Sequence, residues 1–151
     1  MEFPPDLALR LVKHRVPIVA ANCMARRFPY FLTARDEQNK EVLTLSETTG
    51  LQKVSRAGTG IMLIHCQIFK ALSPPWFEYG WNAETRKPTG EDFVFCDKAR
   101  QAGFDIYVDH DLSKLVSHHG TFGFHPLMRS GFLEAEAEID KSRLKADDSA
   151  A

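Results

Sequence analysis

Two adjacent carboxylates, Glu91 and Asp92, are the side chains whose type and spacing most clearly suit chemistry. They follow Thr89 and a glycine, and they open a segment with a helical apolar period. A carboxylate that is held in place and partly removed from water can accept a proton as a general base. The structural alternative is that Asp92 pairs with Thr89 in a capping box, while Glu91 only complements the helix dipole.

Two neighbouring histidines, His118 and His119, follow a predicted strand and precede a glycine. A neutral imidazole together with two carboxylates is a reasonable ligand set for Mn²⁺. Neighbouring residues of an extended segment point to opposite sides, so only one of these histidines would face such a site. Two alternatives stay open: loop histidines without a ligand, and a metal-dependent hydrolase that uses Glu91, Asp92 and His118. The hydrolase would need more ligands than the sequence offers.

The elements that position these residues are a predicted helix at 91–102 and a predicted strand at 104–108. Gly103 lies between them, where a left-handed helix cap is expected. Because the apolar period changes from helical to alternating at this glycine, the sequence favours an α/β fold. The other expected elements are a helix at 4–13, buried strands at 18–21 and 62–64, and one or two helical turns at 67–72.

The composition is that of a single globular domain. The chain has 151 residues, of which 44% are hydrophobic, and its net charge of −1 gives no electrostatic reason to expect nucleic acid as a partner. Its three cysteines form no Cys-x-x-Cys pair, so neither a zinc knuckle nor a disulfide framework is indicated. With no signal region and no apolar run long enough to cross a bilayer, a cytoplasmic protein without a transmembrane segment is expected.

Several segments resemble, in the same order along the chain, the C-terminal half of a GT-A-fold glycosyltransferase of the family 2 type. The first four read MEFPPDLALRLV, PIVAAN, AGTGIMLIHCQIFKAL and PPWFEY. The others are a Gly-Glu-Asp that opens a short helix, the run AGFDIYVDHDL, and a His-x-Gly. The resemblance covers roughly residues 1 to 125, and its specific part is the order of the segments, since each motif alone is weak.

The resemblance implies a mixed-sheet α/β domain, with residues 1–133 as the acceptor-side half of a GT-A-like domain and residues 134–151 as a charged tail. It implies an inverting, metal-dependent transfer of a sugar from a nucleotide-sugar donor to a carbohydrate or lipid-linked acceptor. Asp92 would be the catalytic base, and Glu91 would orient it or hold an acceptor hydroxyl. His118 would be a ligand of the Mn²⁺ or Mg²⁺ ion, with His119 as the second choice.

Two further places would line the acceptor pocket according to this resemblance. The turn formed by Gly58, Thr59 and Gly60 would allow a close approach, although an ordinary turn between strands explains the same residues. Trp76 and Phe77 would stack on a sugar, because an aromatic ring offers a flat apolar surface. The alternative for these two rings is burial in the core.

The run Asp109-His110-Asp111 spells Asp-x-Asp, which is the metal signature of such transferases, but it stands at the wrong place. It follows the predicted helix and strand, where the family shows only an acidic strand end. We therefore expect Asp109 to end the strand and Asp111 to cap the turn at Leu112, with no metal bound by either.

The family's Asp-x-Asp and its nucleotide-binding half would stand before Met1. Three explanations for the missing half are open: the gene start was assigned too late, the protein is a natural remnant, or another chain supplies the half. In each of them we expect the polypeptide alone to lack most of the donor site and to be inactive by itself. The non-enzymatic alternative is a remnant that binds itself or a partner, because a sheet cut through its middle leaves an apolar edge open.

Overall fold

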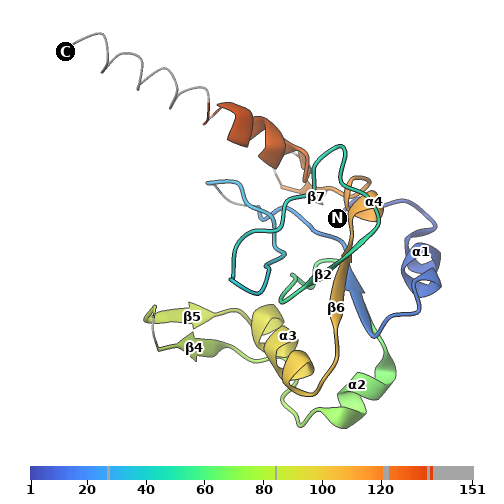
Figure 1. The fold of residues 1–151 in the computed structure, drawn as a ribbon, viewed down its shortest axis with the longest axis vertical. Coiled ribbons are helices and arrows are strands. Elements are labelled where there is room, and N and C mark those ends of the chain that lie inside the picture. Colours follow the sequence, from blue (N-terminus) through green and yellow to red (C-terminus); the bar gives the residue numbers. More distant parts are fainter. Residues whose placement is uncertain (27, 84, 121–122, 136, 138–151) are drawn as a thin grey trace.

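The computed structural model describes residues 1–26, 28–83, 85–120, 123–135 and 137, and Figure 1 shows its fold. Most of the expected tail at 134–151 lies outside the described residues. The chain forms an α/β domain around a sheet with the strand order β2-β6-β1-β3. These strands are β1 (Ile18–Ala20), β2 (Leu51–Val54), β3 (Met62–Ile64) and β6 (Ile106–Asp109).

The sheet is mixed, as the resemblance implied. β1 runs parallel to β6, and the two outer strands, β2 and β3, run antiparallel to their neighbours. Ile18, Val19 and Ala20 are fully buried because both faces of β1 are covered. This burial explains why the strand is a continuous apolar run rather than an alternating one.

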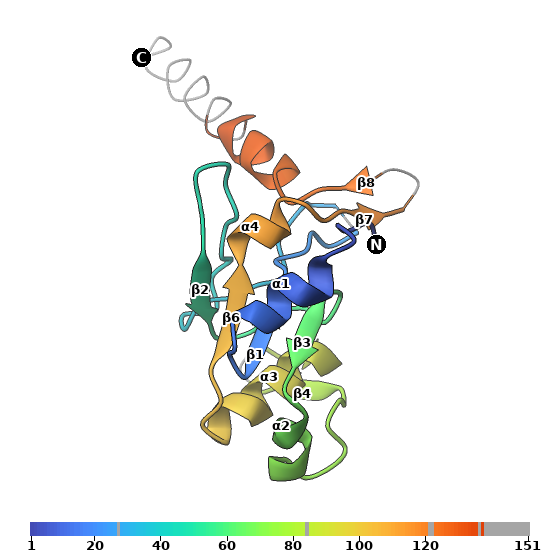
Figure 2. The ribbon, with the colours of Figure 1, turned by 90° about the vertical axis from the view of Figure 1, so that its right-hand side faces the viewer.

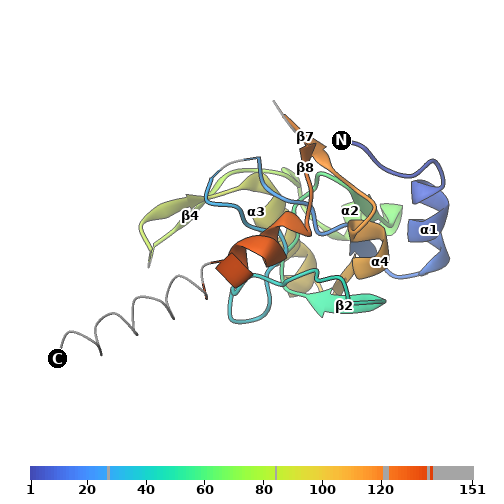
Figure 3. The ribbon, with the colours of Figure 1, turned by 90° about the horizontal axis from the view of Figure 1, so that it is seen from above.

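Helices cover the two faces of the sheet. They are α1 (Leu7–Lys13), α2 (Cys66–Ala71), α3 (Glu91–Gln101) and α4 (His110–Ser113). Phe95 of α3 shares one core cluster with Ile18, whereas Leu11 of α1 shares another with Val19. Figures 1 and 3 show α1 and α3 on opposite sides of the sheet. Among the described residues, no helix is long and apolar enough to cross a membrane.

The predicted junction at Gly103 is confirmed. Gly103 has a φ of +87°, in the left-handed region, and the Phe104 N–H donates to the Ala99 carbonyl at 3.0 Å. This bond makes Phe104 part of the helix cap, so β6 begins at Ile106 and not at residue 104 as expected. Ile106 and Val108 belong to the core cluster on the α3 side, as their alternation predicted.

The first helix begins at Leu7 and not at Pro4 as expected. The Leu7 N–H donates to the Pro4 carbonyl at 3.0 Å, so the two prolines form a turn before the helix. Asp6 is the N-cap residue, but its side chain makes no capping bond. It pairs with Arg10 instead, at 2.9 Å. The expected helical turns at 67–72 are confirmed as α2, one residue earlier.

A β-hairpin stands where the sequence suggested only loops. Its strands, β4 (Gly80–Asn82) and β5 (Lys87–Thr89), pair with each other and not with the central sheet. Strands of this length are too short for an alternating pattern to be detected. Asn82 helps to form the turn, because its Oδ1 accepts from the Thr85 N–H at 2.8 Å. A further short sheet pairs β7 (His118–His119) with β8 (Gly123–Phe124).

Replacing Gly103 by alanine should destabilise the protein, because an alanine is strained at a φ of +87°. No other part of the structure lies within 4 Å of the added Cβ, so the cost is that of the backbone, about 1 kcal/mol. Gly131 is the matched control, since it lies in a helical segment and is equally unobstructed. Gly131→Ala should stabilise the protein by about 1 kcal/mol. Urea unfolding measures both changes, and shifts of the same sign would contradict the left-handed cap.

Candidate functional site

Asp92 lies in the first turn of α3, directly after the hairpin. The helix N-cap is Gly90, which makes no side-chain bond, so the expected capping box between Thr89 and Asp92 is wrong. Thr89 belongs to β5 instead, and the Asp92 carboxylate accepts from the Phe93 N–H at 2.8 Å. A Cβ on residue 90 would lie 2.9 Å from Asp92 Oδ1, so the glycine leaves room for this carboxylate.

The environment of Asp92 makes its carboxylate more basic than that of an ordinary aspartate. The side chain is half-buried, and burial raises its pKa. The Phe93 N–H acts in the opposite direction, and the negative charge of Glu91 adds to the increase. The helix N-terminus also favours the ionised form, but the net pKa of Asp92 remains above its usual value.

Glu91 contacts Tyr79, which precedes β4 in the chain. The charge of Glu91, and a hydrogen bond that the Tyr79 hydroxyl donates to it, raise the pKa of Tyr79. Tyr79 is 77% exposed, so this pair lies open to solvent beside Asp92. Tyr79 was not among the candidates from the sequence, and its only signal was its place in the segment PPWFEY.

A close approach brings the hairpin against α3. A Cβ on Gly80 would lie 2.8 Å from Cγ2 of Val94, so a larger residue there would push β4 away from the helix. Figure 1 shows the hairpin beside the start of α3. The approach places the neighbours of Gly80, Tyr79 and Trp81, beside the first two turns of this helix. Both rings are exposed.

Trp76 and Phe77 are partly packed and partly open. Phe77 stacks on Phe95, with ring centroids 4.6 Å apart. Trp76 makes a T-shaped contact with Phe69, with ring centroids 5.3 Å apart, and donates its indole N–H to the Leu72 carbonyl at 3.1 Å. Their exposed fractions are nevertheless 38% for Trp76 and 41% for Phe77. Core packing accounts for one side of each ring, and stacking on a sugar stays a prediction for the other.

The turn Gly58-Thr59-Gly60 begins against the middle of α3, not at Asp92 itself. Ala57, which precedes it, donates its N–H to the Cys96 sulfur at 3.5 Å. A Cβ on Gly58 would lie 2.9 Å from that of Thr33, so this position needs a glycine, whereas Gly60 has only ordinary contacts. Thr59 is exposed. A role for this turn in binding an acceptor stays a prediction.

His118 is oriented as a metal-binding histidine usually is. Its Nδ1 lies 3.1 Å from the Met24 carbonyl, which can only accept, so Nδ1 carries the proton and Nε2 keeps its lone pair in the neutral ring. His119 is occupied differently, since its Nε2 lies 2.9 Å from a Glu2 carboxylate oxygen. Of the two, His118 therefore suits a metal better.

The structure does not bring His118 and Asp92 into contact. Figures 1 and 2 show β7 near the N-terminus, at one end of the domain, and α3 toward the other end. In the part of the chain that the structure describes, no group of three or more His, Cys, Asp or Glu side chains is placed to hold a metal. The hydrolase alternative gains no support from this arrangement, and the role of His118 stays a prediction.

The run Asp109-His110-Asp111 has a structural role. Asp109 ends β6, as predicted, and its Oδ1 accepts from the Leu112 N–H at 2.9 Å. Asp109 is therefore the cap of α4, and the expectation that Asp111 caps this turn is wrong. Asp111 instead accepts from the Gly50 N–H at 2.9 Å, which ties α4 to the start of β2.

The Asp92 carboxyl should titrate above the usual aspartate range and the Asp111 carboxyl below it. Burial raises the pKa of Asp92, whereas the Gly50 N–H lowers that of Asp111. A raised pKa in the folded state stabilises the fold at low pH, and this contribution is lost as the pH rises through that pKa. A lowered pKa stabilises the fold at higher pH, and this contribution is lost as the pH falls through that pKa.

The change in the free energy of unfolding caused by Asp92→Asn should therefore be more favourable at neutral pH than at acid pH. The change caused by Asp111→Asn should be less favourable at neutral pH than at acid pH. Carbon-13 NMR titration of the two carboxyls, with unfolding measured at both pH values, checks this prediction. An Asp92 pKa at or below that of Asp111 would contradict it.

Comparisons with known proteins do not assign the chain to a family. No protein-family model matches the chain, and neither a curated protein nor a solved structure matches it. What the chain does must therefore follow from the chemistry of its own residues and from the order of its segments.

Proposed function

We propose that this chain provides the acceptor-side half of an inverting, metal-dependent glycosyl transfer, with Asp92 as the general base. The observation that carries the proposal is the half-buried Asp92 carboxylate with a raised pKa, held at a helix start beside Glu91 and the exposed Tyr79. A general base works best when its pKa is shifted toward the working pH. The order of the segments that resemble family 2 transferases supports the same assignment.

In this reaction an acceptor hydroxyl attacks the anomeric carbon of the donor sugar. A bond forms between the hydroxyl oxygen and that carbon, while the bond from the carbon to the donor phosphate oxygen breaks and the nucleotide diphosphate leaves. Asp92 takes the hydroxyl proton, which requires the hydroxyl to come within about 3 Å of its carboxylate. Glu91, which already accepts a hydrogen bond from Tyr79, would hold a second hydroxyl of the acceptor.

The acceptor would lie along the exposed aromatic side chains next to these carboxylates. A sugar ring presents apolar C–H faces together with hydroxyls, so flat rings beside carboxylates match both of its parts. The rings are Trp76 and Phe77, which are anchored in the core on one side, and Tyr79 and Trp81, which are more exposed. The turn Gly58-Thr59-Gly60, in the loop between β2 and β3, would border the same site.

The described residues fit a divalent cation only in part. His118 offers one imidazole nitrogen in the required tautomer, and the proposal needs further ligands and a nucleotide-binding half from elsewhere in the protein or from a second chain. A bound Mn²⁺ or Mg²⁺ would neutralise the negative charge of the leaving diphosphate. By itself, the described part of the chain is proposed not to turn over a nucleotide sugar.

A second candidate is a non-catalytic α/β domain that binds another copy or a partner. The observation that favours it is an open strand edge at β3, which has β1 as its one neighbour in the central sheet within the described part of the chain. The two candidates are compatible, because the edge and Asp92 lie on different elements.

Asp92→Asn should lower the transfer rate about 10²- to 10⁴-fold in the protein that includes a nucleotide-binding half. Donor affinity should remain nearly unchanged, because the donor is held by that other half. Asp111→Asn, at an exposed aspartate outside the proposed site, is the matched control and should retain activity. The measurement is the transfer rate and donor affinity of both variants beside the wild type. Near-normal turnover in Asp92→Asn, or a loss caused only by weaker donor binding, would sink the assignment.

Mn²⁺ added to the chain should broaden the NMR signals of the β7 segment, and this broadening should depend on His118 and not on His119. The reason is that His118 keeps a free ring nitrogen, whereas the ring of His119 is paired with Glu2. One imidazole makes a weak site, so high metal concentrations are needed. His118→Ala should abolish the local broadening and His119→Ala should preserve it. Broadening that follows His119 and Glu2 instead would remove His118 from the metal site.

A further inference from the structure

The outer strand β3 ends the central sheet on the side away from β2. It pairs with β1 along one edge and has no strand on the other among the described residues. Figure 2 shows it outermost in the sheet, next to α1. Its residues are apolar, and all of them are half-buried. An open edge of this kind presents backbone groups that another strand can bond.

The register of the β1–β3 pair shows which backbone groups face β1. The Ala21 N–H donates to the Ile61 carbonyl at 3.0 Å, and the His65 N–H donates to the Pro17 carbonyl at 2.9 Å. Bonded and non-bonded pairs alternate along an antiparallel ladder. Leu63, midway between these two positions, therefore also turns its N–H and its carbonyl toward β1.

Met62 and Ile64 consequently turn their backbone groups outward, away from β1. Each offers one N–H and one carbonyl at the open edge. In the described part of the chain, no recorded hydrogen bond reaches any of these four groups. Met62 and Ile64 lie on either side of Leu63. A rotation of 180° about an axis through Leu63 therefore exchanges their positions and leaves the pattern of donors and acceptors at the edge unchanged.

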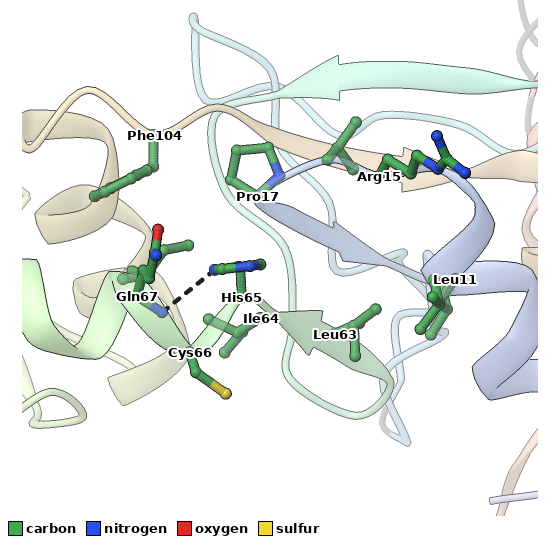
Figure 4. A pocket seen from close by; sticks show the side chains of 12 residues that line it. Leu11, Arg15, Pro17, Leu63, Ile64, His65, Cys66, Gln67 and Phe104 are labelled. Atoms are coloured by element: carbon green, nitrogen blue, oxygen red, sulfur yellow. Dashed lines mark hydrogen bonds between the residues drawn. The ribbon is translucent and has the colours of Figure 1, made fainter.

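An apolar groove adjoins the same edge. It has a volume of about 690 Å³ and lies between α1, the end of β3 and the start of α2 (Figure 4). Leu63, Ile64 and Val12 are among its lining residues, together with the charged Arg15 on the α1 side, and Val12 is 57% exposed. The segment 58–67, which contains β3, has no Asp, Glu, Lys or Arg. The edge therefore lacks the charges with which exposed strands usually prevent pairing.

The opposite edge of the sheet is protected, in contrast. β2 carries Lys53, which forms an ion pair with Asp105 at 2.6 Å. Just after β2, Arg35 from another loop forms a bridge with Arg56. A charged lysine and an adjoining chain segment are two usual means of protecting an edge strand. The sheet is thus open at β3 and protected at β2.

We propose that β3 is a dimer contact at which two copies of the chain join their sheets. The two β3 strands would run antiparallel around a two-fold axis at Leu63. Met62 of each copy would face Ile64 of the other, which bonds all four outward groups of each edge. The grooves beside the two strands would add apolar area to the contact.

A second copy fits this edge for two reasons. The edge is complementary to itself in its hydrogen bonds, and the segment 58–67 carries no charged side chain that would repel its own copy. A two-fold contact uses the same surface on both copies, so the assembly closes at a dimer and does not continue as a fibre. This inference rests on the second candidate function, for which it names the partner and the register, and it does not depend on Asp92.

The first test is the mass of the whole chain in solution, from micromolar to near-millimolar concentration, by sedimentation and light scattering. The wild type should reach twice the chain mass of 17.1 kDa. Met62→Pro should return the mass to that of the monomer while the fold is kept, because it removes only an outward N–H. Lys53→Pro is the matched control on the other edge and should leave the dimer intact. A wild type that stays monomeric throughout, or a folded Met62→Pro that still dimerises, would overturn the proposal.

The second test does not depend on how well the proline variant folds. In a Cys66→Ser background, which removes the exposed native thiol, Leu63→Cys should cross-link two chains under mild oxidation. Opposite residues in a non-bonded antiparallel pair lie about 4.5 Å apart at Cα, within disulfide range. Met62→Cys is the register control, because each Met62 would face Ile64 and not its own copy. Equal cross-linking of the two variants, or none by Leu63→Cys, would also overturn the proposed contact.

Discussion

The complete burial of β1 is the constraint on which the rest of this structure depends. Ile18 and Val19 face opposite sides of the sheet and are both inaccessible to solvent. Such a strand is stable only with strands along both edges and helices over both faces, which is the arrangement observed. The helix that covers the Ile18 side is α3, and packing of its Phe95 determines where Asp92 stands one turn earlier. The position of the proposed base is thus a consequence of core packing.

A single buried amide orders the long segment that follows β1. Asn22 is inaccessible to solvent, and its side chain donates to the Val42 carbonyl at 2.7 Å and accepts from the Ala34 N–H at 3.0 Å. Its own N–H donates to the Ser113 hydroxyl at 2.7 Å. Buried polar groups are costly unless they are bonded, so this network admits few other arrangements of the loop. The loop that Asn22 joins is therefore ordered although it shows little helical or alternating periodicity.

The surroundings of Asp92 combine opposing electrostatic effects at the start of one helix. Burial raises the pKa of the carboxyl, while the adjacent N–H lowers it. The helix itself is held by Arg56, whose guanidinium forms two bonds of 2.8 Å with Asp97 and lies over the Phe93 ring. A carboxylate held in this way has a fixed direction as well as a shifted pKa, and the proposed role of Asp92 as a base needs both.

The sequence by itself determined the α/β class, the helix at Glu91–Gln101 and the left-handed glycine after it, because their signals lie within a few neighbouring residues. The mixed sheet was expected only from the order of the segments. The sequence did not show the β4–β5 hairpin, whose strands are too short for a period, and it misplaced the cap of α3. Only the tertiary structure decided that Tyr79 meets Glu91, that His118 bonds the Met24 carbonyl, and that β3 is left open. These features depend on how separate elements pack against one another, which local preference along the chain does not determine.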